Sequence, residues 1–167
     1  MGEKLKLCLG CMEPKTDDGI CPNCGYSNNA PYLPSYIAPG KILNERYLVG
    51  KLLSYNGEGA TYLAYDSVTN RKNFIKEYMP DTLCNRVKGS SIISVNQNNL
   101  VQYKAFMSEF TELNKVLAKM RTLNHINPAL DLFAENNTTY VVFDYVEGIT
   151  LKEYLQENAG ELSWDEV

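Results

Sequence analysis

Four cysteines near the N-terminus have the spacing of a metal site. Cys8 and Cys11 form one Cys-x-x-Cys pair, and Cys21 and Cys24 form a second. Two intervening residues let both sulfurs of a pair reach one ion, and two such pairs complete the tetrahedral four-thiolate site that structural zinc prefers. The sequence therefore predicts a zinc ribbon over residues 1–25, with these four cysteines as the metal ligands.

Two disulfides are the alternative use of these cysteines. Disulfides belong to oxidising compartments, and the N-terminal stretch "MGEKLKLCLG" lacks the apolar core and cleavage site of a signal peptide. A cytoplasmic location is therefore expected, and its reducing conditions favour the metal. A module of about 25 residues cannot fold on an apolar core alone, so the metal is expected to hold the ribbon together.

A lysine inside an apolar strand is the second candidate for chemistry. The stretch "NFIKEYMP" (residues 73–80) reads as a strand, with Lys76 in its middle. A buried or half-buried lysine costs free energy unless an anionic group meets it, so Lys76 is expected to meet one. Strand alternation places Phe74 on the same face as Lys76. The fifth cysteine, Cys84, has no partner in sequence and is read as a small apolar residue.

The elements that position these residues begin after a linker. Residues 26–40 contain three prolines and show neither a helical nor an alternating period, which predicts a semi-rigid extended linker. Three short runs rich in β-branched and aromatic residues follow, at 46–54, 60–68 and 71–79, separated by turn-forming residues. They predict an antiparallel meander, and the stretch "VKGSSIISVN" is expected to add a hairpin strand.

Helical spacing appears in the second half of the chain. From residue 100 to residue 123 apolar side chains recur every three or four positions, which predicts a helix packed on one face. Two strands are expected at 129–135 and 138–146, joined by a turn at Asn136-Asn137.

Capping boxes mark two further helix starts. Thr150 and Glu153 have the spacing that predicts a short helix. The same device recurs at Ser163 and Glu166, so the chain is expected to be part of a longer protein.

Composition excludes two classes of function. The formal net charge is −4 and no basic cluster occurs in the 167 residues, whereas nucleic-acid binding needs a basic face that displaces counterions. No apolar run approaches the roughly 18 residues that span a bilayer. Neither a nucleic-acid partner nor a membrane segment is therefore expected in this chain.

The order of the expected elements resembles the N-terminal lobe of a protein kinase. "LLSYNGEGATYLAYD" looks like the glycine-rich loop between the first two strands, "FIKE" like the strand-three lysine motif, and "YVVFDYVEG" like strand five entering the hinge. "KEYMP" and the fusion to a zinc ribbon resemble bacterial eukaryotic-like Ser/Thr kinases. The resemblance covers residues 41–167 and implies an α+β lobe with a five-stranded antiparallel sheet and one C helix.

The resemblance implies roles for particular residues. Lys76 matches the lysine that anchors the nucleotide phosphates, so ATP and Mg²⁺ are the expected cofactors of the full-length protein. Phe143 matches the gatekeeper. The remaining positions that match the adenine site or the loop over the phosphates are Leu53, Ser54, Asn56, Gly59, Thr61, Phe74, Asp144, Tyr145 and Val146.

Three departures from the kinase pattern weaken that implication. Ser54 and Asn56 replace two of the three loop glycines, which permit close approach of backbone to phosphate. Phe74 replaces an alanine that forms one wall of the adenine pocket, and its ring is expected to project toward the base. The acid of the C helix is uncertain, because Glu112 and Glu109 are candidates while the apolar phase favours Leu113.

Two functions follow as alternatives. The 167 residues contain neither the His-Arg-Asp catalytic loop nor the Asp-Phe-Gly metal-binding motif, so this chain alone is not expected to transfer phosphate. It is either the N-terminal part of a Ser/Thr protein kinase or a pseudokinase whose lobe and ribbon bind other proteins. In both cases the expected organisation is a ribbon at 1–25, a linker at 26–40, the lobe at 41–146, and the hinge exit with the start of the C-lobe at 147–167. The protein substrate or partner is not specified by the sequence.

Overall fold

The computed structural model describes residues 6–15 and 19–159. Two short strands lie in the cysteine-containing segment, β1 (Lys6–Leu7) and β2 (Pro14–Lys15). The remaining elements are β3 (Ile42–Leu43), β4 (Tyr47–Asn56), β5 (Gly59–Asp66), β6 (Arg71–Tyr78), β7 (Cys84–Arg86), β8 (Ile93–Val95), the 3-10 helix η1 (Gln97–Asn99), α1 (Leu100–Lys119), β9 (Ala129–Glu135), β10 (Thr138–Asp144) and α2 (Leu151–Glu157).

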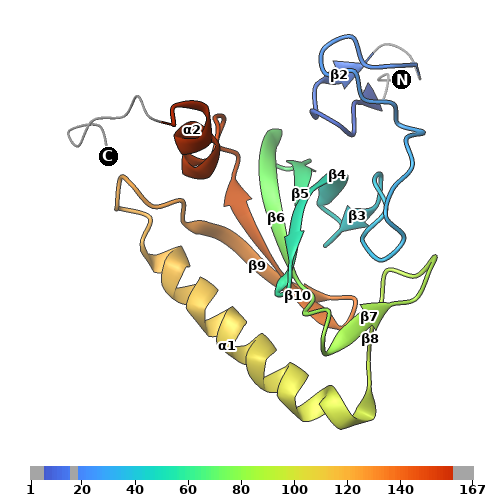
Figure 1. Cartoon of the computed structure of the whole chain (residues 1–167), viewed down its shortest axis with the longest axis vertical. Helices are drawn as coiled ribbons and strands as arrows, with labels where there is room; N and C mark the ends of the chain where they lie inside the picture. Colours follow the sequence, from blue (N-terminus) through green and yellow to red (C-terminus); the bar gives the residue numbers. More distant parts are fainter. Residues whose placement is uncertain (1–5, 16–18, 160–167) are drawn as a thin grey trace.

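One antiparallel sheet forms the body of the molecule. Its six strands have the order β3-β4-β5-β6-β10-β9, and β7 and β8 form a separate hairpin. The expected meander and the two later strands are confirmed. The sheet has one strand more than the predicted five, because β3 pairs its two residues with the start of β4. Figure 1 shows α1 running along one side of the sheet and the cysteine segment lying beyond β4.

Side-chain alternation divides β6 between two environments. Asn73, Ile75 and Glu77 are buried on one face, whereas Lys72, Phe74 and Lys76 are only partly buried. The strand therefore presents its lysines and Phe74 toward the α1 side and contributes the other three side chains to the core.

Local turn and cap signals in the sequence are confirmed. Asn136 and Asn137 both have positive φ, 55° and 61°, as the primed hairpin turn between β9 and β10 requires. Thr150 and Glu153 form the expected capping box, with the Glu153 N–H donating to Thr150 Oγ1 at 3.2 Å. The second predicted box, at Ser163 and Glu166, lies outside the described residues.

Helix α1 is shorter than the apolar periodicity suggested. It ends at Lys119, whereas the pattern ran to Leu123. The stretch that follows contains Asn124 and the Asn127-Pro128 pair, which favour turns over helix. Tyr103 is buried in the helix interface, with its ring 5.4 Å from that of Tyr78. No helix among the residues that the structure describes has the length and apolar character needed to cross a bilayer.

A buried ion pair lies at the centre of the core. Arg86 from β7 pairs with Glu77 from β6, and neither side chain is exposed to solvent. The hydroxyls of Tyr62 and Tyr140 donate to the Glu77 carboxylate at 2.7 Å and 2.8 Å. Arg86 also donates to Ser91 O and Ser35 O, each at 3.1 Å. The charges of Glu77 and Arg86 are thus compensated by each other and by hydrogen bonds.

Part of the linker packs on the sheet. Ile37 is 2% exposed and belongs to the main apolar cluster. Its backbone N–H donates to the Tyr62 hydroxyl at 3.1 Å, and the ring of Tyr36 lies 5.1 Å from that of Tyr55. The end of the predicted linker therefore lies against the sheet, with Tyr36 and Ile37 packed on it.

A second ion pair predicts a pH dependence of stability. Arg46 Nε and Nη2 donate to the Asp66 carboxylate at 2.8 Å and 2.7 Å, and this guanidinium lowers the pKa of Asp66 below its usual value. Because the folded-state pKa lies below the unfolded value of about 3.9, the stabilisation is fully present above about pH 4. It is lost as the pH falls toward the folded-state pKa.

Asp66→Asn is therefore expected to lower the free energy of unfolding at pH 7 by roughly 1.5–3 kcal/mol and to flatten its decline between about pH 5 and pH 2. Urea unfolding at a series of pH values measures both effects. Asp81→Asn, at an exposed aspartate, is the control. Equal pH slopes for Asp66→Asn and the wild type would contradict the expectation.

Candidate functional site

The four cysteine sulfurs converge at one point. All four Sγ atoms lie within 4.8 Å of one another, with Cys8 and Cys24 3.6 Å apart and Cys11 and Cys21 3.8 Å apart. Tetrahedral zinc with Zn–S bonds of about 2.3 Å places its sulfurs roughly 3.8 Å from each other. A disulfide needs about 2.05 Å, and all four are free thiols. The group could therefore hold a metal ion, as the spacing predicted.

Backbone donors shape this group. The Gly10 N–H donates to Cys8 Sγ at 3.3 Å, as expected of a tight turn between two ligands. A hydrogen bond from the backbone N–H of Cys24 lowers the pKa of the Cys21 thiol to about 7. Desolvation by neighbouring protein atoms raises the pKa of the Cys24 thiol to about 12, although the residue as a whole is exposed. Since only thiolates bind metal, a cation at the centre is needed to keep all four sulfurs deprotonated.

Lys76 lies in a cavity between the sheet and α1. Its side chain is 33% exposed, with Nζ 3.7 Å from Glu58 Oε2 and 5.7 Å from the centre of the Phe110 ring. The cavity has a volume of about 700 Å³, and the lining residues that matter to its chemistry are Glu58, Lys76, Tyr78, Glu109, Phe110, Leu113 and Phe143.

The two helix acids named from the sequence take different positions. Glu109 lines the cavity together with Leu113. Glu112 pairs instead with Lys115 at 2.7 Å on the exposed side of α1. Among the described residues, the carboxylate of Glu58 is the only one within 4.0 Å of Lys76 Nζ. The acidic partner of the lysine therefore comes from the β4–β5 hairpin and not from the helix.

The β4–β5 hairpin satisfies its own backbone donors. Asn56 pairs with Gly59, leaving Gly57 and Glu58 as a two-residue turn. Asn56 Oδ1 accepts hydrogen bonds from the N–H groups of Glu58 and Gly59, at 3.0 Å and 3.2 Å. A Cβ at Gly59 would lie 1.9 Å from the carbonyl oxygen of Glu77, so this glycine permits the close approach of β5 to β6. Ser54 is exposed on β4 before the turn.

Phe74 meets the segment that follows β10. Its ring lies 5.0 Å from that of Tyr145, and its strand neighbours are Leu63 and Phe143. Neither Phe74 nor Tyr145 lines the Lys76 cavity, whereas Phe143 does. The two rings thus pack against each other where the resemblance places the adenine wall and the hinge.

The other residues predicted for the adenine site do not line the cavity. Leu53 is exposed and Thr61 half-buried, and Asp144, Tyr145 and Val146 are exposed. The Asp144 carbonyl accepts a hydrogen bond from Asn127 Nδ2 at 2.9 Å. One carbonyl group of the predicted hinge therefore already accepts a hydrogen bond from a side chain of the protein.

Sequence reasoning missed two polar residues of the cavity. Glu58 faces Lys76 because the tight turn brings it over the end of β6, where its carbonyl accepts from Met79 N–H at 3.0 Å. Tyr78 is 5% exposed, and its hydroxyl has no hydrogen-bond partner among the described residues. Strand alternation places Tyr78, two residues after Lys76, on the same face of β6, so its place in the cavity could have been predicted from the strand.

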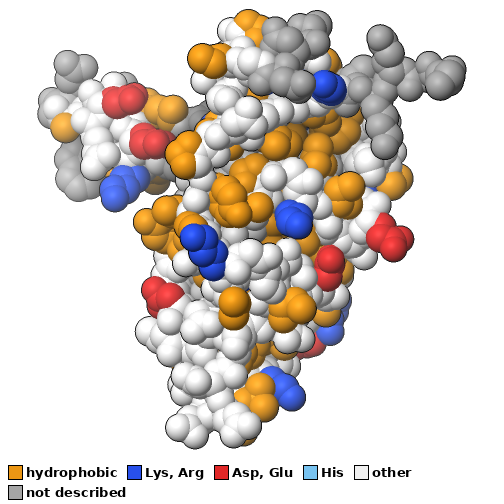
Figure 2. Space-filling view, turned by 90° about the vertical axis from the view of Figure 1, so that its right-hand side faces the viewer, with side chains coloured by type: hydrophobic (Ala, Val, Ile, Leu, Met, Phe, Trp, Pro, Cys, Tyr) orange, Lys and Arg blue, Asp and Glu red, His pale blue; other side chains and the backbone are white. Residues whose placement is uncertain are grey.

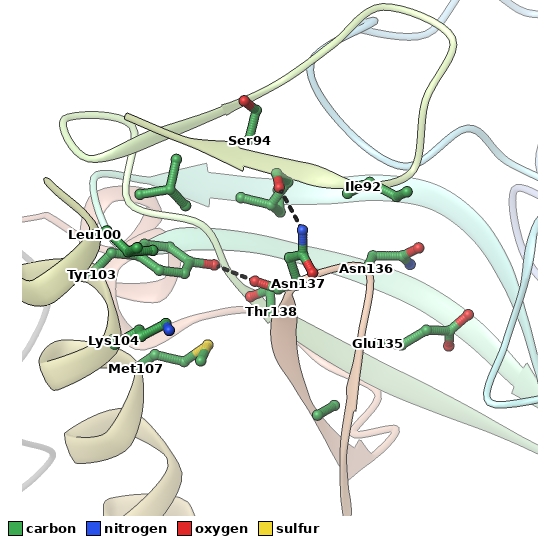
Figure 3. Close-up of a pocket in the computed structure, with 13 residues that line it drawn as sticks. Ile92, Ser94, Leu100, Tyr103, Lys104, Met107, Glu135, Asn136, Asn137 and Thr138 are labelled. Carbon is green, nitrogen blue, oxygen red and sulfur yellow. Dashed lines mark hydrogen bonds between the residues drawn. The ribbon is translucent and has the colours of Figure 1, made fainter. Parts of the chain in front are cut away.

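A second cavity, of about 870 Å³, lies between the β7–β8 hairpin, the start of α1 and the β9–β10 turn. The Tyr103 hydroxyl donates to Asn137 O at 2.9 Å (Figure 3). Asn137 Nδ2 in turn donates to Ile93 O at 3.3 Å. None of the residues named from the sequence as site candidates lines it.

The charged side chains are dispersed over one face of the molecule. On the face shown in Figure 2, lysines and arginines stand apart and are interspersed with acidic, apolar and uncharged side chains. That face offers no continuous basic strip of the kind that follows a nucleic-acid backbone.

Comparisons in sequence point to bacterial kinases. The chain is 24% identical over 128 residues to a probable serine/threonine-protein kinase of Clostridium acetobutylicum, and 27% identical over 121 residues to the serine/threonine-protein kinase PrkC of Bacillus subtilis. These matches cover 77% and 71% of the chain but only 16% and 15% of the two relatives. No protein-family profile matches the sequence.

Comparisons in structure agree. The apo form of PpkA-294 superposes with a TM-score of 0.66 at 27% identity, covering 80% of this chain and 44% of that one. The PknI kinase domain of Mycobacterium tuberculosis superposes with a TM-score of 0.56 at 18% identity, covering 78% of this chain and 44% of that one. At this identity the similarity shows only that the two share a fold. Both the predicted fold and the predicted similarity to bacterial Ser/Thr kinases are confirmed.

Proposed function

We propose that this kinase-like N-terminal lobe, similar to those of bacterial Ser/Thr kinases, is the nucleotide-facing part of an ATP-dependent Ser/Thr protein kinase. The observation that carries the proposal is the position of Lys76. It is a partly exposed cation on the α1 side of β6, in a cavity large enough for a ligand, and it matches the phosphate-anchoring lysine.

The residues of the cavity suit a ligand with phosphate oxygens. Lys76 offers three N–H donors to an anion. The buried Tyr78 hydroxyl lacks an acceptor among the described residues, and an unsatisfied buried donor costs free energy that a ligand oxygen would recover. ATP with Mg²⁺ would supply the transferable phosphoryl group and its charge neutralisation. Glu58, now near Lys76, would have to give way to the phosphates.

The proposal also gives a role to each of the other segments of the chain. Residues 41–146 would form the lobe, 147–167 the hinge exit and the start of the second lobe, and 26–40 the linker. The ribbon at 1–25 would hold zinc through Cys8, Cys11, Cys21 and Cys24, because four thiolates with sulfurs 3.6–3.8 Å apart across two pairs suit that ion. Catalysis would need further groups, since neither catalytic motif occurs in these residues.

A second candidate function is a pseudokinase scaffold, in which lobe and ribbon bind other proteins. Three contacts favour it. The Phe74 and Tyr145 rings pack together at the predicted adenine wall, Asn56 Oδ1 occupies N–H groups of the loop over the phosphates, and Glu58 places a carboxylate beside Lys76. Each of these would have to be displaced by a nucleotide.

Thermal unfolding with Mg-ATP separates the two functions. If the lobe binds nucleotide, a concentration one hundred times the dissociation constant should stabilise the full-length protein by about 2.7 kcal/mol. Lys76→Met should remove this shift, because it removes the phosphate anchor. No shift of the wild type at millimolar Mg-ATP would favour the scaffold.

Phe74→Ala is the matched test of occlusion. Removing the ring should open the space beside Tyr145 and increase the Mg-ATP shift over that of the wild type. Phe133→Ala, at a half-buried phenylalanine of β9 that stacks on Tyr47 and Tyr140 away from the cavity, is the control for general destabilisation. An unchanged shift in Phe74→Ala would contradict the occlusion of the base.

A further inference from the structure

The cysteine segment is bound to the sheet through a bulge in β4. The pairing of β4 with β5 shifts register between Val49 and Leu52, which releases the intervening backbone from the ladder. The freed N–H of Lys51 donates to the carbonyl oxygen of Leu9 at 2.8 Å. Leu9 lies between Cys8 and Cys11, so the hydrogen bond comes from the turn between two metal ligands.

Gly50 allows the segment to approach closely. A Cβ at this position would lie 2.3 Å from Met12 Cε and 2.5 Å from Leu9 O. Met12 is 2% exposed although it belongs to a small module at the surface, and its φ is 58°. The methionine is therefore buried by the sheet, and the absence of a side chain at Gly50 makes room for it.

A second contact reaches the segment after β10. Lys72 pairs with Glu13, and the two side chains are 29% and 44% exposed. Lys72 Nζ also lies 5.7 Å from the centre of the Tyr145 ring, which packs on Phe74. Lys72 thus contacts the cysteine segment on one side and the predicted hinge on the other.

We propose that the metal-loaded cysteine segment is a regulatory module that acts on the hinge within the same chain. Metal binding orders the turn that carries Leu9 and Met12, and only the ordered turn fits the β4 bulge. Docking then holds Glu13 against Lys72 and so fixes Lys72 over Tyr145. Loss of the metal releases Lys72 and with it the packing of Tyr145 on Phe74.

For the metal to control docking, it must bind the docked state more tightly than the undocked one. A ligand shifts a conformational equilibrium only by its difference in affinity for the two states. In the docked state the turn that carries Leu9 and Met12 already has the conformation that binds metal. Docking therefore increases the affinity for metal, and metal increases the affinity of the segment for the sheet. The proposal concerns the state of the hinge and is independent of whether the cavity takes a nucleotide.

Backbone amide chemical shifts measured by NMR test the proposal on this 167-residue chain, with zinc as the added metal. Removing zinc with a chelator is expected to move the resonances of Lys51, Lys72 and Tyr145 while leaving those of Asn85 and Ser94, in the β7–β8 hairpin, in place. Zinc-dependent shifts confined to residues 6–30 would overturn the proposal.

Three variants separate docking of the cysteine segment from metal binding. Gly50→Ala is expected to bind one zinc ion while Tyr145 no longer responds to it, because the added methyl group blocks the seat of Met12. Lys72→Glu should likewise remove the zinc response of Tyr145. The double variant Glu13→Lys/Lys72→Glu restores the ion pair with the cysteine segment, but the Tyr145 response should stay absent, because a carboxylate makes no cation–π contact with the ring. Arg71→Glu, at the exposed neighbour of Lys72, is the control. A Tyr145 response in Lys72→Glu equal to that of the wild type would refute the route through Lys72.

Discussion

Replacing Cys21 by serine is expected to abolish stoichiometric zinc binding. The Sγ atoms of the four cysteines lie within 4.8 Å of one another, and a structural zinc site of this type contributes roughly 10–16 kcal/mol of apparent binding free energy in small fingers. Serine supplies a hard oxygen that does not ionise near neutral pH, so one of the four ligands is lost. Zinc content measured by mass spectrometry should fall from about one ion per chain to below about 0.1.

The matched control is the fifth cysteine. Cys84 is buried in an apolar cluster with Ile93 and Tyr103, where its Sγ donates to Pro80 O at 3.2 Å. Burial raises the pKa of its thiol to about 12, so it is a small apolar residue, as the sequence predicted. Cys84→Ala should retain one zinc ion. Equal zinc content in Cys21→Ser and Cys84→Ala would contradict the four-cysteine site.

Replacing Arg86 by methionine is expected to lower the free energy of unfolding of the lobe by about 3–5 kcal/mol. Both side chains of the Arg86–Glu77 pair are fully buried, so the variant leaves the Glu77 carboxylate without a cation in the core. Tyr62 and Tyr140 still donate to it, but two neutral hydroxyls do not compensate a full charge. Since a domain is stable by about 5–15 kcal/mol, urea unfolding followed by circular dichroism should show a large shift of the midpoint.

Two further variants make the cause of that loss identifiable. Arg71→Met removes an exposed arginine and should change stability by less than about 0.5 kcal/mol. Adding Glu77→Gln to Arg86→Met should recover part of the loss, because the amide is neutral. Its oxygen still accepts from one of the two tyrosines, and its NH2 group can donate to the hydroxyl oxygen of the other. If Arg86→Met costs no more than Arg71→Met, the buried pair does not support the fold as described.

Much of the local structure could be predicted from neighbouring residues. The bounds of β9, the turn at Asn136-Asn137 and the capping box at Thr150 depend on residues a few positions apart. The convergence of Cys8, Cys11, Cys21 and Cys24 was equally predictable, because all four lie within one short segment and have the pairwise spacing of a metal site.

The immediate surroundings of Lys76 were not predictable in the same way. The resemblance indicated an acid on the helix, whereas the structure brings Glu58 from the β4–β5 turn. That outcome depends on the two-residue length of the turn and on the Asn56 side chain that holds it closed. The orientation of Phe74 followed from strand alternation, but its contact with Tyr145 needed the path of the chain after β10.

By itself, the sequence determined the order of the elements, the convergence of the four cysteines and the face of β6 that carries Lys76, since each follows from periodicity or short spacing. Only the tertiary structure decided that Glu77 pairs with Arg86, that the cysteine segment sits on Gly50, and that Lys72 joins Glu13 to Tyr145. These contacts join residues of different elements, some of them far apart in the chain. Their formation depends on how the elements pack, which no local preference of the residues involved encodes.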